Sequence, residues 1–344
     1  MADISSELID TEKVSAWIVE RADVEDPLTF ELIAGGRSNM TFTVYDGEIP
    51  KFVLRRPPTG PLLPSAHDMA REYRLMDALS SSHVPVPSMV GLCQDDAVNG
   101  RDFYVMQFVD GIVVRDIDIG SSFSEATRKT MSESLVATLI ALHEVDIDSV
   151  GLGDLAKRTG YIQRQVKRWT GQWQSSRTRD LPIVDAVAEK LMAQMPEPNP
   201  TAIAHGDYRL SNCMVDADGH VVAVLDWELC TLGEPMADLG GLLGYWHDPA
   251  ETDSTGDSET TGLAGFLTQE EIADLYSEGS GVAKDSINYY RAFAQWRLAC
   301  IAEGVYARYL AGQQGDQDED IDLERMNASV GERAERAAQL LGMI

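Results

Sequence analysis

Polar and apolar residues alternate in the first third of the chain, which is the pattern of β-strands with one buried face. The alternation is clearest over 40–45 and over 51–56, where a pair of prolines stops it. Asp46 and Gly47 stand between the two runs, and an Asp-Gly pair in that position predicts a β-hairpin. Further extended runs are predicted at 29–33, 88–94 and 103–108.

A helical period appears once among these strands. Apolar residues recur at spacings of three and four over 67–79, and three serines follow, so a helix is predicted there. Residues 1–108 are therefore predicted to form a β-rich lobe with a leading helix. Over residues 25–108, after the leading helix, the expected order is strand, strand, strand, helix, strand, strand.

The pattern becomes mainly helical afterwards, so residues 109–344 are predicted to form a second, helical lobe. One short hairpin interrupts it, with strands at 213–216 and 221–225. Two acidic stretches, 247–262 and 313–322, are predicted to be mobile surface loops. Helices are predicted at 124–143, with Ser124 as the N-cap, at 183–195 and at 284–310.

The predicted fold class is thus α+β with two lobes, and a ligand is expected in the crevice between them. The 344 residues are 44% hydrophobic and 24% charged, as in ordinary globular proteins. With 28 Lys and Arg against 56 Asp and Glu, the net charge is −28, so nucleic-acid binding is not expected. No apolar run approaches the ~20 residues that cross a bilayer, and the chain starts without a signal-peptide pattern. We therefore expect a cytoplasmic protein without a membrane partner.

The strongest chemical signal lies over 203–215. Asp207 and Asn212 stand five residues apart in the run His-Gly-Asp-Tyr-Arg-Leu-Ser-Asn, and Asp226 follows the short hairpin. Phosphoryl transfer needs a carboxylate near the acceptor hydroxyl, a neutral oxygen ligand for Mg²⁺ and a second carboxylate that holds the metal on the phosphates. These three residues supply one group for each task.

With these motifs the chain resembles the aminoglycoside phosphotransferase and choline kinase superfamily, over most of residues 30–310. The resemblance implies a two-lobed, protein-kinase-like fold that uses ATP (or GTP) and Mg²⁺ and phosphorylates a hydroxyl of a small molecule. It implies that Asp207 acts as base or orients the acceptor. It also implies that Asn212 and Asp226 hold magnesium.

The same resemblance places the nucleotide in the first lobe. Residues 35–39 lie where the family covers the phosphates, Glu72 lies where a glutamate pairs with a phosphate-binding cation, and 106–109 lie at the hinge. The nucleotide contacts implied in this way are Ser38, Asn39, Met40, Arg55, Glu72, Gln107 and Val109.

One position departs from the family pattern. The usual strand lysine is absent, and the strand ends with Arg55 and Arg56. Because alternate residues of a strand face opposite ways, only one of them can reach the cleft, and the pattern alignment favours Arg55. Arginine binds phosphate in a forked geometry and is always charged, but it is bulkier than lysine.

Other residues near the motif are expected to support the fold. His205 and Asp238 resemble the family residues that brace the catalytic loop, so neither is expected to react. Tyr289, Phe293 and Trp296 recur on one helical face and are predicted to lie in the core. Tyr245, Trp246, His247 and Arg297 are candidates to line an acceptor pocket, but nothing in their spacing requires it.

The acceptor is left open by the sequence. The runs 53–58 and 226–228 are similar to a branch that includes stand-alone bacterial kinases and the amino-terminal part of acyl-CoA dehydrogenase fusion proteins. That branch implies a hydroxyacyl acceptor, whereas other relatives take aminoglycosides, choline or sugars, and the net charge points toward cations. A catalytically silent nucleotide-binding regulator is a further alternative. A protein kinase is disfavoured because Trp227 and Glu228 replace the Phe-Gly that follows its metal-binding aspartate. The oligomeric state is not predicted.

Overall fold

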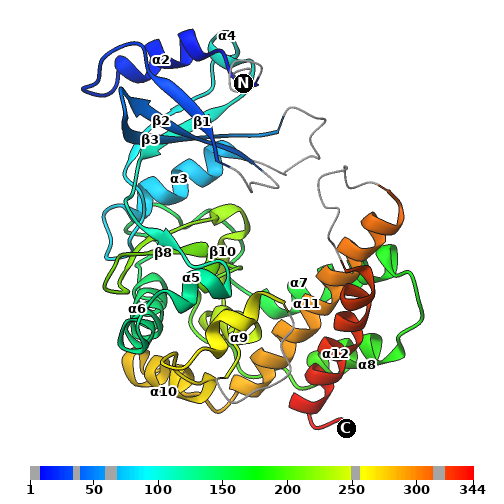
Figure 1. The fold of residues 1–344 in the computed structure, drawn as a ribbon. Coiled ribbons are helices and arrows are strands. Elements are labelled where there is room, and N and C mark those ends of the chain that lie inside the picture. The colour runs from blue at the N-terminus through cyan, green and yellow to red at the C-terminus, as the bar shows by residue number, and fades with distance from the viewer. Residues whose placement is uncertain (1–7, 34–38, 59–67, 249–255, 313–321) are drawn as a thin grey trace.

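The computed structural model describes residues 8–33, 39–58, 68–248, 256–312 and 322–344. A sheet with flanking helices forms the upper lobe, and a larger group of helices with short strands lies beneath it (Figure 1). The upper lobe consists of α2 (Thr11–Val19), β1 (Thr29–Leu32), β2 (Met40–Asp46), β3 (Ile49–Arg56), α3 (Met69–Leu79), β4 (Met89–Cys93), α4 (Asp96–Asn99) and β5 (Phe103–Gln107). The mixed fold class agrees with the sequence-based prediction, and so does the order of elements except for the short helix α4 between β4 and β5, which is not predicted.

The upper sheet has the strand order β1-β2-β3-β5-β4, and every pair in it is antiparallel. Arg55 stands opposite Thr41 on one side and Tyr104 on the other. The predicted turn of the hairpin contains Gly47, whose φ of +61° lies in the left-handed region that glycine adopts without steric cost.

The lower lobe is mainly helical, as predicted. It contains β6 (Ile112–Val113), α5 (Ile117–Ser121), α6 (Glu125–His143), α7 (Tyr161–Ser176), α8 (Pro182–Ala193), β7 (Ala202–Ala204), β8 (Cys213–Val215), β9 (Val221–Val224), β10 (Thr231–Gly233), α9 (Pro235–Tyr245), α10 (Gln269–Ser280), α11 (Ile287–Leu310) and α12 (Leu323–Leu340). Short 3₁₀ helices lie at Leu210–Asn212, Trp227–Leu229 and Gly256–Gly262.

Several predicted boundaries shift for physical reasons. Helix α3 begins at Met69 rather than at 67, because the Asp68 carboxylate caps it by accepting the Arg71 N–H. Ser124 caps α6 as predicted and accepts the Thr127 N–H. The acidic stretch 247–262, predicted to be a surface loop, ends in a 3₁₀ helix whose Thr260 and Thr261 are buried, so the prediction is wrong there. The parts of the two acidic stretches at 249–255 and 313–321 lie outside the described residues.

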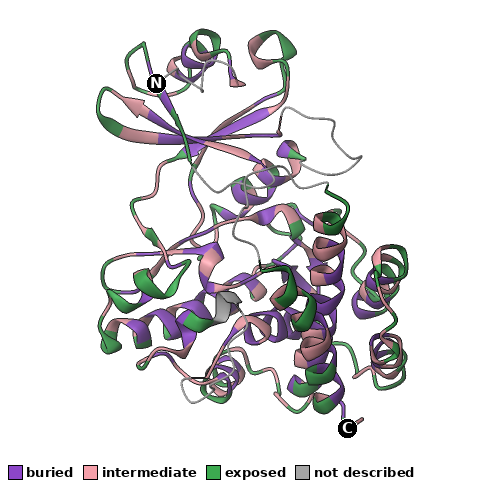
Figure 2. Cartoon of the chain, turned by 45° about the vertical axis from the view of Figure 1, so that its right-hand side comes forward, coloured by how far each residue is buried: buried purple, intermediate pink, exposed green. Residues whose placement is uncertain are grey.

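Two hydrophobic cores hold the molecule together. The smaller one lies between α2 and the upper sheet, with Trp17, Phe42 and Phe103 among its members. The larger one fills the lower lobe and continues up to the other face of the sheet at Tyr104. Buried positions follow the inner faces of the helices throughout (Figure 2).

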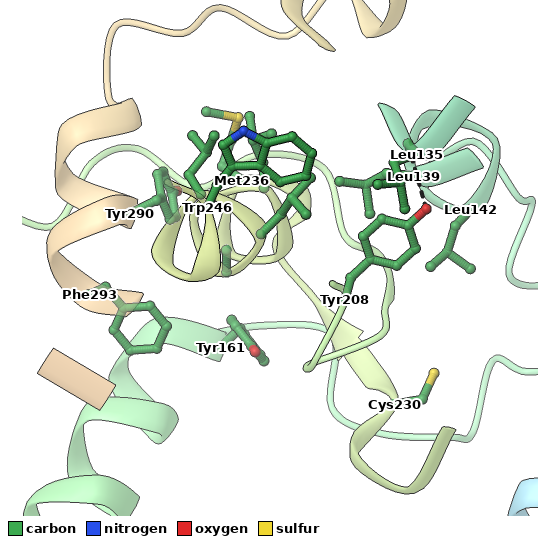
Figure 3. Packing of buried hydrophobic residues seen from close by; sticks show 14 of the residues in the cluster. Leu135, Leu139, Leu142, Tyr161, Tyr208, Cys230, Met236, Trp246, Tyr290 and Phe293 are labelled. Carbon is green, nitrogen blue, oxygen red and sulfur yellow. Dashed lines mark hydrogen bonds between the residues drawn. The ribbon is translucent and has the colours of Figure 1, made fainter. Parts of the chain in front are cut away.

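The lower core packs around α9 and the loop after β7 (Figure 3). The Tyr208 hydroxyl is buried there and donates a hydrogen bond to the Leu135 carbonyl at 2.9 Å. Tyr289, Phe293 and Trp296 are buried in this core, which confirms their predicted structural role. No helix within the described ranges is long and apolar enough to span a membrane.

Candidate active site

The loop that carries Asp207 leaves β7 through a tight backbone turn at Gly206. Its φ is +84°, and a Cβ at this position would stand 2.8 Å from the Leu229 carbonyl oxygen. A side chain would therefore be both strained and obstructed. The glycine lets the backbone turn so that Asp207 follows directly at the lobe junction.

Asp238 on α9 fixes the backbone of this loop. Its buried carboxylate accepts the His205 N–H at 2.5 Å and the Gly206 N–H at 2.8 Å. His143 lies 3.4 Å away and is itself bonded to the Tyr276 hydroxyl at 2.7 Å. Burial opposes ionisation of Asp238, but the hydrogen bond and electrostatic effect of His143, with those of His205 and the Gly206 N–H, outweigh it and lower its pKa. The structure thus gives Asp238 the bracing position that the sequence predicts.

Both ring nitrogens of His205 are engaged within the fold. Nε2 lies 2.9 Å from the Leu225 carbonyl oxygen, and Nδ1 accepts the Asp207 N–H at 3.3 Å. His205 therefore holds the loop against the strand that leads to Asp226, as expected of a scaffold residue.

Asp207 and Asn212 face each other across the loop. The Asn212 side-chain N–H group donates to the Asp207 carbonyl at 2.8 Å and to its carboxylate at 2.9 Å. This orientation leaves the amide oxygen of Asn212 as the available ligand atom. The charged neighbour of the carboxylate is Arg209, whose Nε lies 3.6 Å from Asp207 Oδ2.

Asp226 follows β9 in an unusual backbone conformation. Its φ of +63° is the one positive value at a non-glycine residue in the described ranges. Such a conformation costs about 1–3 kcal/mol and persists at sites where the surrounding structure enforces it. Its Oδ1 atom is buried without a hydrogen-bond partner among the described residues, and Arg55 Nη2 lies 4.0 Å away. The strain turns a carboxylate oxygen toward the lobe junction and leaves it unsatisfied.

Arg55 and Glu72 form an ion pair in the upper lobe. Arg55 Nη1 lies 3.3 Å from Glu72 Oε2, and Glu72 is only 2% exposed. The Tyr104 hydroxyl donates to the same carboxylate at 2.9 Å, and the Asn39 amide donates to its other oxygen at 3.0 Å. Burial raises the pKa of Glu72, while the Arg55 charge and these hydrogen bonds oppose the rise.

Arg56 lies on the opposite face of β3, as strand alternation predicts. Its guanidinium donates to the backbone carbonyls of Leu8 and Pro57 instead of facing the cleft. Met40 is the cross-strand partner of Arg56 and packs against the smaller core. The structure therefore does not bring the Met40 side chain to the site, because cross-strand partners share a face.

The structure describes three of the four remaining predicted nucleotide contacts. Gln107 ends β5 with an exposed side chain, and its N–H donates to the Ser88 carbonyl at 2.8 Å. Val109 is half-buried in the connection between the lobes. Asn39 is buried against Glu72, so its side chain supports the ion pair. Ser38 lies outside the described residues.

One contact between the lobes has no counterpart in the sequence-based prediction. Arg71 on α3 donates to the carbonyl of Glu228 at 3.4 Å and to that of Cys230. These carbonyls belong to the turn directly after Asp226. The helix that carries Glu72 is thereby tied to the segment that carries Asp226. In the sequence, Arg71 is recognisable only as a basic residue next to Glu72, and that position does not identify its partner.

The donor set at the junction fits a magnesium ion shared with phosphates. No group of three or more His, Cys, Asp or Glu side chains among the described residues could hold a metal alone. Mg²⁺ in kinases takes only one or two protein ligands and completes its shell with phosphate and water. The unsatisfied oxygen of Asp226 and the amide oxygen of Asn212 fit that requirement.

Comparison with known proteins identifies the family. Residues 29–267 match the phosphotransferase enzyme family APH. The crystal structure of a Ralstonia eutropha JMP134 protein assigned as an aminoglycoside phosphotransferase is 34% identical, has a TM-score of 0.82 and covers 97% of this chain and 98% of its own. The chain belongs to the phosphotransferase enzyme family, with the kinase-like fold that its sequence resembles.

Two further matches are a longer protein that contains a similar region and a solved structure with the same fold. Human acyl-CoA dehydrogenase family member 11 is 35% identical over 301 residues, which are 86% of this chain and 38% of that protein. The chain thus spans well under half the length of such curated relatives. The ADP-bound aminoglycoside phosphotransferase APH(2'')-Ib is 16% identical, with a TM-score of 0.56 over 96% of this chain and 99% of its own, and shares the fold.

Proposed function

We propose that this protein transfers the γ-phosphoryl group of ATP to a hydroxyl of a small molecule, with Mg²⁺ bound at the lobe junction. The observation that carries the proposal is the meeting of two groups of residues there. Asp226 of the lower lobe lies within 4.0 Å of Arg55, which is paired with Glu72 of the upper lobe. Membership of the phosphotransferase family and the ADP-bound fold neighbour support a purine nucleotide.

Each residue of the junction has a defined role in this proposal. Asp207 accepts the proton of the acceptor hydroxyl or orients it, and Asn212 holds the Asp207 carboxylate in place. Asn212 and Asp226 would hold the metal, which neutralises charge on the transferred group. Arg55 would contact the phosphates, and Glu72 fixes its position. Residues 1–108 would bind the nucleotide and 109–344 the acceptor.

The acceptor we propose is a hydroxylated acyl compound. The support is the 35% identity with human acyl-CoA dehydrogenase family member 11, a protein named for acyl chemistry. Aminoglycosides, choline and sugars are the alternatives. A release assay for ADP across hydroxy acids, hydroxyacyl-CoAs, kanamycin, choline and hexoses separates them. ADP release with kanamycin and with no hydroxyacyl compound would reverse the choice.

We expect Asp226→Asn to weaken the binding of magnesium nucleotide. The substitution replaces a charged oxygen by a neutral one, and Mg²⁺ prefers charged, hard oxygen ligands. The measurement is the affinity for AMP-PNP with and without magnesium. Asp218→Asn is the matched control, because Asp218 is exposed in the turn of the neighbouring hairpin. An equal gain from magnesium in Asp226→Asn and wild type would show that Asp226 is no ligand.

We expect Arg55→Met to lower kcat/KM for ATP by about 10- to 150-fold, which corresponds to one charge-assisted phosphate contact. Arg55→Lys should recover much of this loss, since lysine keeps the charge. Arg56→Met is the control on the same strand. It removes hydrogen bonds to Leu8 and Pro57 and can lower Tm, but it should leave the KM for ATP unchanged. A larger KM effect at Arg56 than at Arg55 would contradict the assignment.

A further inference from the structure

Two arginines lie against the second half of α9, the helix that ends at Tyr245. The Arg209 guanidinium lies 4.8 Å from the centre of the Tyr245 ring, while its Nε lies 3.6 Å from the Asp207 carboxylate. Arg209 and Tyr245 also line a small pocket together with Ser211. A substrate hydroxyl that reaches Asp207 from this side would pass next to a cation.

The second arginine, Arg297, is buried without a counter-charge. It is 8% exposed and lies on α11, where its Nη2 would be 3.8 Å from a Cβ added at Gly241 of α9. Gly241 is one helical turn before Tyr245, so both arginines reach the same end of α9. The Nε of Arg297 has no hydrogen-bond partner in the described part of the chain, and no described carboxylate forms an ion pair with it.

The same charged groups influence the ionisation of Tyr245. Burial is the main cause that raises the pKa of Tyr245 to about 12, and the Asp207 charge adds to it. Arg209, Arg297 and Arg333 all oppose that rise. Three guanidinium groups therefore act on the same phenol hydroxyl as the carboxylate of Asp207.

Arg297 is difficult to explain as a structural residue. A buried charge without a partner costs free energy of folding, and fully buried arginines are normally paired. The chain has 56 acidic residues, yet none described pairs with Arg297. By contrast, the buried Glu303 on the same helix is satisfied by Arg179 and Thr178. The position of Arg297 suits a cation whose counter-charge is supplied by a bound ligand.

We infer that Arg297 and Arg209 together bind an anionic group of the acceptor, a carboxylate or a phosphate ester, while Asp207 receives its hydroxyl. The inference rests on the proposed function and adds the charge of the substrate to it. The net charge of −28 favours cations at long range, but a contact of this kind is decided by the groups nearest to the ligand. A polycationic aminoglycoside would place its charge against these arginines.

The test measures binding with the nucleotide site filled by AMP-PNP and magnesium. Two matched probe pairs are titrated by calorimetry: 3-hydroxybutanoate against 3-hydroxybutanamide, and glycerol 3-phosphate against glycerol. The carboxylate pair and the phosphate pair distinguish the two sources of the anion. We expect wild type to bind the anionic member of at least one pair about 10- to 150-fold more tightly, as for a charge-assisted hydrogen bond.

Arg297→Met and Arg297→Gln should both lose this preference. Arg177→Met is the matched control, because it removes the same charge at an exposed position with Asp185 as its ion-pair partner at 4.0 Å. We also expect the Tm of Arg297→Met to equal or exceed that of wild type, since no protein partner is orphaned. Arg297→Gln keeps a polar side chain and decides the question if Arg297→Met does not fold.

The inference is overturned if wild type binds both members of each pair equally or not at all. It is equally overturned if an Arg297 variant that folds retains the anion preference. A failure of the proposed function looks different: no hydroxyl compound would release ADP, although the anion preference persists. Conversely, ADP release from neutral or cationic acceptors that is equal in wild type and Arg297→Gln would leave the proposed function standing and remove the inference.

Discussion

Replacing Asp207 with alanine is expected to reduce phosphoryl transfer by about 10²- to 10⁴-fold, the usual contribution of a positioned general base. The loop itself should survive the change. Asn212 still donates to the Asp207 main-chain carbonyl at 2.8 Å, and Asp238 still holds the two N–H groups before it. Because the carboxylate acts on the acceptor, the affinity for AMP-PNP should stay within about twofold of wild type.

The measurements are kcat with the acceptor found in the panel and the dissociation constant for AMP-PNP with magnesium. Asp218→Ala is the matched control, since it removes the same group from an exposed turn of the adjacent hairpin. Asp207→Asn keeps the shape of the side chain and separates the loss of a base from the loss of volume. Undiminished turnover in either Asp207 variant would exclude the carboxylate from the chemistry.

The parts of the site that the sequence predicts are those that depend on local geometry. Asp207 and Asn212 belong to one loop, so their separation along the chain limits their separation in space. Strand alternation predicts that only one of Arg55 and Arg56 reaches the cleft, and the family pattern favours Arg55; the ion pair with Glu72 agrees with that choice. Family resemblance supplied the pairing with Glu72, which lies on another element.

The contacts that the sequence does not predict join distant elements. Arg71 meets carbonyls 157 and 159 residues further along the chain, and only the packed lobes bring them together. In the sequence, Arg297 is one arginine of a predicted helix. Its burial follows only from the packing of α9 against α11. Backbone carbonyls accept hydrogen bonds at every residue, so no side-chain pattern marks the ones that matter here.

The missed helices have different causes. Helix α9 contains three glycines and is buried on nearly all sides, so it shows no amphipathic stripe. Its Gly240 is required by packing, because an added Cβ would stand 2.6 Å from the Tyr290 carbonyl oxygen on α11. Helix α7 is different: Val166, Trp169 and Trp173 follow helical spacing and are buried, so its sequence does carry a helical pattern.

Asp238→Asn is expected to cost about 3–5 kcal/mol of stability, the usual penalty when one member of a buried charged network is removed. The side chain keeps its shape, but an amide N–H₂ would replace one of the oxygens that accept the His205 and Gly206 N–H groups. Two donors would then face each other, or the loop would shift. Because Asp207 follows Gly206 directly, kcat should fall even at temperatures at which the variant is folded.

The pH dependence of Tm separates the contribution of the Asp238 charge from that of its side-chain shape. The fold lowers the pKa of Asp238, so its stabilising effect is complete above the ordinary carboxyl pKa and is lost as pH falls through the lower folded value. The gap in Tm between wild type and Asp238→Asn should therefore narrow in acid. Asp116→Asn is the matched control, because Asp116 also accepts a backbone N–H, from Ile119 at 2.9 Å, but does so on the surface. If Asp238→Asn and Asp116→Asn unfold at the same temperature and keep full turnover, Asp238 does not brace the catalytic loop. The position of Asp207 would then have to be set by Asn212 and His205 alone.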